Sequence, residues 1–439
     1  MSLFFIKGSQ LLLSLSILII LHELGHFIPA KLFKTRVEKF YLFFDVKFSL
    51  FKKKIGETVY GIGWLPLGGY VKIAGMIDES MDTEHLNKEP EPWEFRSKPA
   101  WQRLIIMLGG VTVNLILGFL IYMMVAFVWG KTIITNDDLP GGYEVAEIMK
   151  PLGFKDGDKI LQVDGKDLEN IIDISKYLFL RNVSTVKVQH YDGKKEVLSI
   201  PQDIGVQMFE TGNMLPFTAL VQPIIDSIEP NSPAEKIGLV SGDLILSVND
   251  NSIIKWQDFT KILKKNKTKT IDLKIERSGR IISKRINLRD DNTIGVGLKI
   301  PVITPTKLNF TISESISKGY DKAYWTLIDY ISQFKYIFSK KGASQLGGFG
   351  AIGGLFPPTW DWQGFWESTA LISIILAFMN LLPIPALDGG HVMFLLYEMV
   401  SGRKPNDKLM EYAQVFGFFL LMSLVLYANG NDVYRAIFG

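Results

Sequence analysis

Residues 17–28 read ILIILHELGHFI, an apolar run that is interrupted by two histidines and a glutamate. Unpaired polar side chains are costly both in a hydrophobic core and in a lipid bilayer, so these three residues need a specific role. In a helix, His22 and His26 lie one turn apart on one face, where two imidazoles can hold one Zn²⁺. Glu23 would stand beside such an ion and could take a proton from an acidified water. The alternative is a pair of buried structural histidines beside a glutamate at a helix end.

The composition of the chain indicates the surroundings of this stretch. Hydrophobic residues make up 47% of the 439 residues and charged residues 21%, which is typical of a membrane protein with soluble parts. The net charge of +3 and the absence of a Lys/Arg block argue against a nucleic-acid partner. The chain has no cysteine, so disulfides and cysteine-bound zinc are excluded. Histidine, aspartate and glutamate remain as candidate zinc ligands.

The apolar run belongs to the first of four segments that predict membrane-spanning helices. It reads as a retained span rather than a signal peptide, because HELGHFIPA follows without a small-residue cleavage site. Basic residues cluster after the first span, before the second, and between the third and the fourth, and the positive-inside rule places these loops in the cytoplasm. Both termini and the long region after the second span then face outward. The predicted spans are 1–35, 104–130, 366–400 and 411–430, and 77–103 is a predicted cytoplasmic loop.

The outward-facing region contains a repeat. GDKILQVDG at 157–165 and GDLILSVND at 242–250 share five of nine positions, which predicts tandem domains over 131–214 and 215–305. The second copy, PIIDSIEPNSPAEKIGLVSGDLILSVND, resembles a PDZ domain, and the first copy is a weaker match without the Ser-Pro-Ala segment. That resemblance implies peptide capture by strand addition. The alternative is a spacer domain without a ligand.

Two further stretches predict structure near the membrane. KFYLFFDVKFSLF and TVYGIGWLPLGGYVKIAG alternate in polarity and carry several glycines, so we predict β-hairpins over 36–76. An ordinary cytoplasmic hairpin is the alternative. Residues 311–340 carry aromatic and aliphatic residues at three- and four-residue spacing, which predicts an amphipathic helix. Such a helix suits a membrane interface, or it could pack against the tandem domains.

A second polar site interrupts the third span, where residues 380–391 read NLLPIPALDGGH. An ionised Asp388 in an apolar segment needs a partner, and a bound cation is the natural one. Pro383 and Pro385 break the helix just before it, and irregular backbone at membrane depth is tolerated only inside the protein or beside a water-filled cavity. We therefore predict a hydrated pocket at Asp388. His391, three residues later, either forms a hydrogen bond at the helix end, which is the favoured interpretation, or competes as a ligand.

HELGH and NLLPIPALDGG resemble the two signatures of the site-2 protease family of zinc intramembrane metalloproteases. The tandem PDZ-like pair is similar to that of the bacterial regulator of sigma-E protease type. The resemblance implies that Zn²⁺ is bound by His22, His26 and Asp388 and that Glu23 is the catalytic base. It also implies hairpins that dip into the membrane beside the zinc, where an extended substrate could add to a sheet edge. The expected substrate-binding residues are Asn380, Pro385, Gly68, Gly69 and Tyr70; for Asn380 an interhelix hydrogen bond is the alternative.

The fold that follows is a multi-pass α-helical membrane protein with four transmembrane helices, a membrane-associated β-hairpin region and two α+β PDZ domains. The resemblance implies an endopeptidase of the bacterial inner membrane, with the PDZ domains on the periplasmic side. Its expected partners are the lipid bilayer, peptide ligands of the PDZ domains and single-span membrane protein substrates, such as an anti-sigma factor or remnant signal peptides. One departure is GGVTVN at 109–114, which keeps Asn114 but has Val111 where the family usually shows proline. A non-catalytic scaffold and a zinc or proton transporter are the alternative functions.

Overall fold

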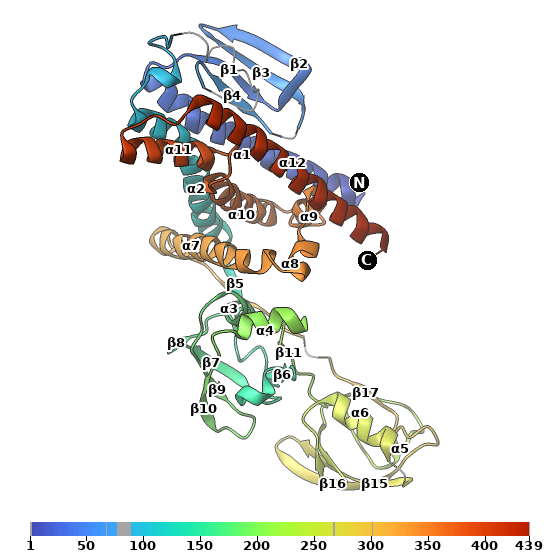
Figure 1. Cartoon of the computed structure of the whole chain (residues 1–439). Helices are drawn as coiled ribbons and strands as arrows, with labels where there is room; N and C mark the ends of the chain where they lie inside the picture. The colour runs from blue at the N-terminus through green and yellow to red at the C-terminus, as the bar shows by residue number, and fades with distance from the viewer. Residues whose placement is uncertain (1, 67, 77–88, 267, 301, 439) are drawn as a thin grey trace. The chain divides into compact units, whose positions relative to one another are not determined.

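A computed structural model of the chain describes residues 2–66, 68–76, 89–266, 268–300 and 302–438 (Figure 1). The chain forms two compact units. One unit combines Met1–Gly130 with Asn309–Gly439, and the other is the intervening Lys131–Leu308. The outward-facing region predicted from the sequence is therefore an independent unit, inserted between the second and third apolar segments.

The described residues contain four helices that are long and apolar enough to cross a membrane, as predicted. The ends of these helices differ from the prediction. Helix α2 begins before residue 104, inside the predicted cytoplasmic loop 77–103. Residues 77–88 of that loop lie outside the described residues. The predicted third span, 366–400, is two helices separated by a break at the two prolines, because proline cannot continue a helix. The four apolar helices are α1 (Leu3–Leu32), α2 (Ala100–Trp129), α10 (Trp362–Leu381) and α12 (Asp407–Phe438), and the shorter α11 (Asp388–Ser401) follows α10 after the break.

The predicted hairpin region is a four-stranded mixed sheet. It comprises β1 (Val37–Leu42), β2 (Phe44–Ile55), β3 (Thr58–Leu65) and β4 (Tyr70–Ile73) in the order β2-β3-β1-β4. Strands β2 and β3 form the expected hairpin, but β3 also pairs in parallel with β1, and β4 lies at the far edge. Strand β2 exposes large apolar side chains, among them Phe48, at 57% of its surface, and Leu50, at 66%. Apolar surface of this kind is rarely left to water and suits contact with lipid.

The middle unit contains two copies of one topology, which supports the predicted repeat. The first copy has a sheet in the order β10-β9-β7-β8 and the second a sheet in the order β16-β15-β13-β14, so equivalent strands occupy equivalent places. Each copy has its own buried apolar core. The first sheet is formed by β7 (Lys159–Val163), β8 (Lys166–Asp167), β9 (Thr185–Gln189) and β10 (Lys195–Ser199), and the second by β13 (Leu244–Val248), β14 (Asn251–Ser252), β15 (Thr270–Arg277) and β16 (Arg280–Asn287). Helices α3 (Ile174–Leu180) and α4 (Ile204–Thr211) belong to the first copy, and α5 (Pro233–Lys236) and α6 (Trp256–Lys265) to the second.

Each copy buries the aspartate of its Gly-Asp pair and balances it differently. Asp158 is fully buried and accepts a hydrogen bond from His190 Nδ1 at 2.7 Å, whereas Asp243 receives two bonds of 2.7 Å from Arg277. Burial raises the pKa of Asp158, and the bonds from His190 and the Lys155 amide only partly offset that effect. Burial acts in the same direction on Asp243, but Arg277 and the Val240 amide hold the pKa of that carboxyl below its usual range. The second copy therefore depends on the charged pair of Asp243 and Arg277.

We expect Arg277→Ala to destabilise the second copy by about 2–3 kcal/mol, because it leaves the Asp243 carboxylate buried without its partner. This value lies below the usual range for a buried pair, since a third of the Arg277 side chain is exposed. Hydrogen exchange on the intact protein should show faster exchange in β13 and β15 and no change in β7 and β9. In the wild type the same contribution should be lost as the pH falls below about 4, since the pKa of Asp243 is lowered by folding. Equal exchange rates in the variant and the wild type would show that the pair adds nothing.

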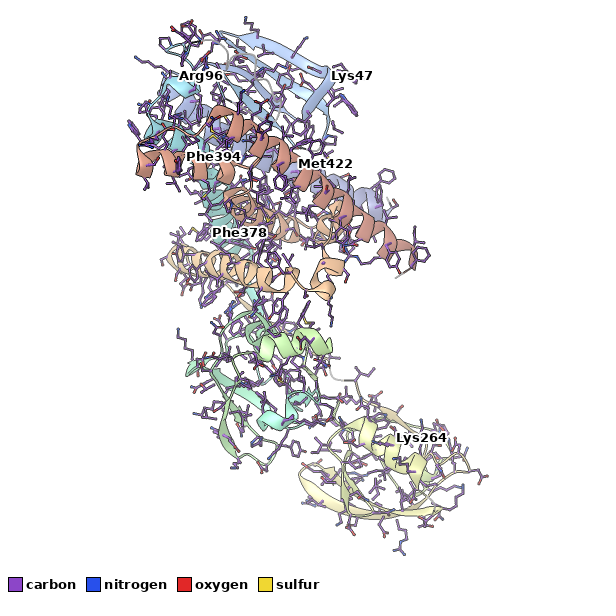
Figure 2. The ribbon with its side chains drawn as sticks, in the orientation of Figure 1. Lys47, Arg96, Lys264, Phe378, Phe394 and Met422 are labelled. Carbon is purple, nitrogen blue, oxygen red and sulfur yellow. The ribbon has the colours of Figure 1, made fainter. Side chains whose placement is uncertain are left out.

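The predicted amphipathic helix is α7 (Ile312–Ile337), and it packs on the apolar helices through small residues. Gly319 lies so close to Met123 of α2 that a side chain there would clash with the backbone of that residue. Near its end, Phe334 packs edge to face against Phe378 of α10, with ring centroids 5.0 Å apart. Figure 2 labels Phe378 among the apolar helices. Much of the predicted apolar stripe, including Ile316 and Tyr320, stays exposed, as in a helix that lies at a membrane interface.

Candidate metal centre

Glycines allow α1 and α2 to touch at the level of HELGH. A side chain at Gly25 would collide with the Gly109 carbonyl of α2, so the two backbones are in direct contact there. Gly110, the next residue, lies directly under both imidazoles, and a Cβ atom at this position would overlap with His26 Nε2 and lie 2.6 Å from His22 Cε1. Small residues allow such close approach of membrane helices. The two histidines are thereby confined to the interface between α1 and α2.

Three potential ligand atoms converge at this interface. His22 Nε2 lies 3.2 Å from His26 Nε2, and the two atoms lie 3.4 and 3.5 Å from Asp388 Oδ2. Asp388 is the first residue of α11, directly after the break between α10 and α11. Within that break Ala386 has a φ of 77°, a left-handed conformation that is costly for a residue with a side chain. The strained turn places the carboxylate opposite HELGH, more than 360 residues away in the sequence.

The spacing of these atoms fits a tetrahedral zinc ion. Ligand bonds of about 2.0–2.1 Å place neighbouring tetrahedral ligands about 3.3–3.4 Å apart, which agrees with the three separations. Without a cation, two imidazole nitrogens and a carboxylate oxygen at this distance would repel one another unless protons lay between them. Asp388 Oδ2 is buried and has no hydrogen-bond partner within the described part of the chain. Two histidines and one carboxylate also form a known type of catalytic zinc site, which keeps a fourth position open.

A second contact of His26 favours one tautomer of its neutral imidazole. Its Nδ1 lies 2.8 Å from the carbonyl oxygen of Ile106 in α2, to which a protonated Nδ1 donates. The proton of a neutral imidazole is then on Nδ1, and the lone pair of Nε2 points toward Asp388 and His22. The imidazole thus presents a lone pair to the point where the three atoms converge.

A small cavity of about 40 Å³ adjoins the three ligand atoms, which is room for one or two water molecules. It is lined by Glu23 from α1 and by residues of β4, including Tyr70. Gly69, just before β4, allows this approach, because a side chain there would collide with Ile19 and the Tyr41 carbonyl. Glu23 is only 9% exposed and thus faces this water-sized space rather than bulk solvent.

Of the other predicted site residues, some lie at the centre and others do not. Asn380 Nδ2 lies 3.5 Å from His22 Nε2, so the side chain reaches the centre. Pro385 instead packs against Gly417 of α12, and Gly68 lies beside the ring of Phe44.

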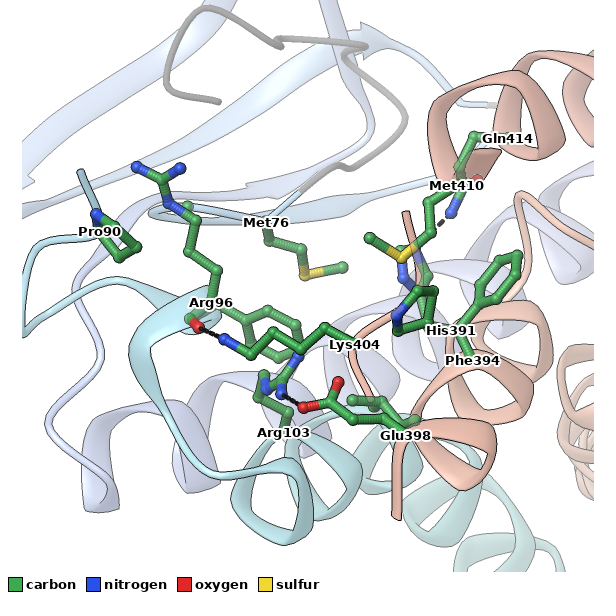
Figure 3. A pocket seen from close by; sticks show the side chains of 14 residues that line it. Met76, Pro90, Arg96, Arg103, His391, Phe394, Glu398, Lys404, Met410 and Gln414 are labelled. Carbon is green, nitrogen blue, oxygen red and sulfur yellow. Dashed lines mark hydrogen bonds and ion pairs between the residues drawn. The ribbon is translucent and has the colours of Figure 1, made fainter. Parts of the chain in front are cut away.

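The competing ligand His391 lies in a second, larger cavity of about 160 Å³ (Figure 3). Its Nε2 is 2.6 Å from Gln414 Nε2 of α12, and it does not belong to the cluster of ligand atoms. In the same cavity Arg103 of α2 forms a 2.5 Å ion pair with Glu398 of α11, which fixes the helix that begins with Asp388 (Figure 3).

A comparison with known protein families matches residues 10–424 to the description "Peptidase family M50". The chain belongs to peptidase family M50. The match includes both HELGH and the Asp388 segment and confirms the resemblance to site-2 proteases.

Full-length relatives agree with this assignment. The Regulator of sigma-E protease RseP of Escherichia coli is 27% identical over 97% of this chain and 98% of the relative. The Regulator of sigma E protease of Haemophilus influenzae is also 27% identical, with the same coverage. A protein of Neisseria meningitidis that is named as a zinc metalloprotease is 28% identical over 96% of this chain and 97% of its own. This M50 peptidase is a membrane-bound, zinc-dependent metalloendopeptidase.

Two residues that shape the centre of this M50 peptidase were not predicted from the sequence to do so. Gly110 is one of many glycines in the chain, and its role depends on what lies opposite it. Asn114 Nδ2 lies 3.2 Å from His22 Nδ1, and Asn114 was recognised only as part of a motif. A signal for Asn114 existed, since a polar side chain in an uncharged apolar span is expensive unless it has a task.

We expect Gly110→Val to lower zinc affinity by at least about tenfold, because its side chain would displace both imidazoles. Zinc content after purification, measured by mass spectrometry, checks this result. Gly8→Val is the matched control, since no described atom lies within 4 Å of a Cβ at Gly8. Full zinc occupancy in the Gly110 variant would contradict the geometry of the centre.

Proposed function

We propose that this chain is an intramembrane endopeptidase, which hydrolyses a peptide bond inside the transmembrane segment of a single-span membrane protein. The observation that carries this proposal is the convergence of His22, His26 and Asp388 beside Glu23, with HELGH inside α1, a helix apolar enough to span a membrane. Membership of a peptidase family supplies the reaction type. The position of HELGH within an apolar helix supports cleavage at membrane depth.

In this proposal His22, His26 and Asp388 hold the Zn²⁺, and Glu23 is the general base. A zinc ion supplies a Lewis acid that polarises the scissile carbonyl and acidifies a water molecule. Glu23 accepts a proton from that water in the small cavity and then gives it to the nitrogen of the leaving amine. Helices α2 and α11 and strand β4 limit the amount of water that reaches the carboxylate.

We further propose that β4 holds the substrate in an extended form. A helical substrate has its carbonyls in hydrogen bonds and its peptide bonds shielded by side chains, so it must unwind before hydrolysis. Strand β4 is an edge of its sheet, and three of its residues, Tyr70, Val71 and Ile73, line the cavity beside Glu23. An unwound segment can add to such an edge through backbone hydrogen bonds. Asn380, near His22, is placed to bind a freed backbone group of the same segment.

For the middle unit we propose two PDZ domains on the periplasmic side of a bacterial inner membrane. The resemblance of 223–250 to PDZ sequences and the shared strand order of the two copies support the domain type. The basic loops between the spans support the orientation. Peptide binding by these domains would screen out substrates whose outer part is still intact. An anti-sigma factor and remnant signal peptides are candidate substrates, and the names of the sigma-E regulators suggest the former.

Cleavage of a reconstituted single-span substrate tests the function. We expect cleavage that stops with a zinc chelator and returns with added Zn²⁺. A protein that binds peptides but neither contains zinc nor cleaves would support the scaffold alternative. Zinc or proton flux into liposomes without cleavage would support the transporter.

A further inference from the structure

Asn114 is a buried amide beside one of the proposed zinc ligands, in a span that otherwise lacks strongly polar side chains at this depth. Its side chain lies one turn of α2 after Gly110 and is 1% exposed. Its Nδ2 lies 3.2 Å from His22 Nδ1. Its Oδ1 has no hydrogen-bond partner within the part of the chain that the structure describes, so this acceptor is available.

The orientation of the amide decides which nitrogen of His22 carries the proton. Amide nitrogen and oxygen positions are assigned from the surrounding hydrogen bonds and can be exchanged by a half-turn. With Nδ2 toward His22, the amide donates to Nδ1, and the proton of a neutral imidazole must be on Nε2. That proton would point at His26 and Asp388, where a zinc ligand needs a lone pair. With Oδ1 toward His22, Nδ1–H donates to the amide and Nε2 is a free donor for the metal.

The second ligand shows the same arrangement already. His26 Nδ1 contacts a carbonyl oxygen, that of Ile106, eight residues before Asn114 and thus on the same helix. Two acceptors on α2 would then fix both imidazoles of HELGH with their Nε2 atoms toward Asp388. The backbone of Asn114 is itself held in place, because the buried hydroxyl of Ser373 in α10 donates to its carbonyl at 2.6 Å.

We propose that Asn114 is the positioning residue for His22: its Oδ1 accepts the Nδ1–H of the imidazole and thereby fixes the tautomer and the ring orientation needed to bind Zn²⁺. This inference rests on the proposed zinc site of His22, His26 and Asp388. It assigns Asn114 a role in metal affinity, in contrast to a hydrogen bond that merely joins two helices.

Three variants of the full-length protein test this role through zinc affinity, measured by competition with a chelator at fixed pH. Asn114→Leu keeps the approximate size and removes the acceptor, and we expect affinity to fall about 10- to 100-fold. Asn114→Asp keeps an acceptor oxygen and should bind zinc within about threefold of the wild type or more tightly. Ser373→Ala, the matched control, removes the link between α10 and α2 without touching His22 and should stay within about threefold.

The outcomes separate this inference from the function on which it rests. Wild-type affinity in Asn114→Leu, or equal losses in the Leu and Asp variants, would overturn the role of Asn114 and leave the zinc site standing. A loss in Ser373→Ala as large as in Asn114→Leu would also overturn it, since the effect would then come from helix packing. A wild-type protein that binds no zinc, or full zinc binding by His22→Ala, would overturn the site itself. If Asn114→Leu does not fold, Asn114→Ala, which also removes the acceptor, takes its place in the same comparison.

Discussion

Glu23→Gln is expected to lower the rate of peptide cleavage by roughly 10³- to 10⁴-fold while zinc content stays at the wild-type level. Glutamine has the same size as glutamate but cannot accept a proton from water, which is the step assigned to Glu23. Glu23 lines the water-sized cavity but does not belong to the cluster of three ligand atoms, so its loss should spare the metal. Single-turnover cleavage of a reconstituted single-span substrate gives the rate, and mass spectrometry gives the zinc content.

The control for this experiment is Glu367→Gln. Glu367 lies on α10 in an exposed ion pair with Lys322, away from the cavity, and its loss should leave the rate unchanged. Undiminished cleavage by Glu23→Gln would remove Glu23 from the mechanism. Loss of zinc together with loss of activity would instead show that Glu23 supports the metal.

Asp388→Ala is expected to lower both zinc affinity and activity, the former by more than about 100-fold. Among the residues that the structure describes, Asp388 provides the one carboxylate of the cluster, and without it the two histidines of HELGH would hold the ion with two protein ligands. Mutation of a residue that only hydrogen-bonds to a metal ligand already lowers metal affinity about 10- to 100-fold, so removal of a ligand itself should lower it further. Titration with a zinc-binding dye on the purified full-length protein measures the affinity.

Asp361→Ala is the matched control for Asp388. Asp361 caps the start of α10 by accepting a hydrogen bond from the Gly364 amide at 2.7 Å, and it contributes no atom to the cluster. We expect a small loss of stability there and normal zinc binding. One zinc per chain in Asp388→Ala, at wild-type affinity, would show that another residue completes the site.

The sequence predicted where helices and strands form better than it predicted which of them pair or pack together. Apolar length identified four helices, and Pro383 and Pro385 predicted the break before Asp388, because both signals are local. The alternation in 36–76 predicted strands but not the parallel pairing of β1 with β3, since alternation specifies a face and not a neighbour. In α7 the aromatic stripe was the stronger pattern, yet the helix packs through Gly319 and Ala323 and leaves Tyr320 half exposed.

The candidate site shows the same limit. His22, Glu23 and His26 form one short motif, and spacing alone predicted that both histidines share a face. The residues that hold them lie on another helix: Ile106 is 80 residues from His26 and Asn114 is 92 from His22. No local pattern links such pairs, and only the packing of α1 on α2 brings them together. Conversely, a place within a motif does not ensure a place at the centre, since Pro385 belongs to the motif but packs against α12.

We propose that this M50 peptidase, with Zn²⁺ held by His22, His26 and Asp388, hydrolyses a bond inside a membrane segment. The decisive measurement is mass spectrometry of the two fragments from a single-span substrate, cleaved by the purified protein in proteoliposomes. We predict one principal cut within the apolar segment of the substrate, with fragments that are absent in the presence of a zinc chelator and absent with Glu23→Gln. Cuts confined to the parts of the substrate outside the membrane, or a chelator-resistant cut within it, would show that the protein is not a zinc-dependent intramembrane endopeptidase.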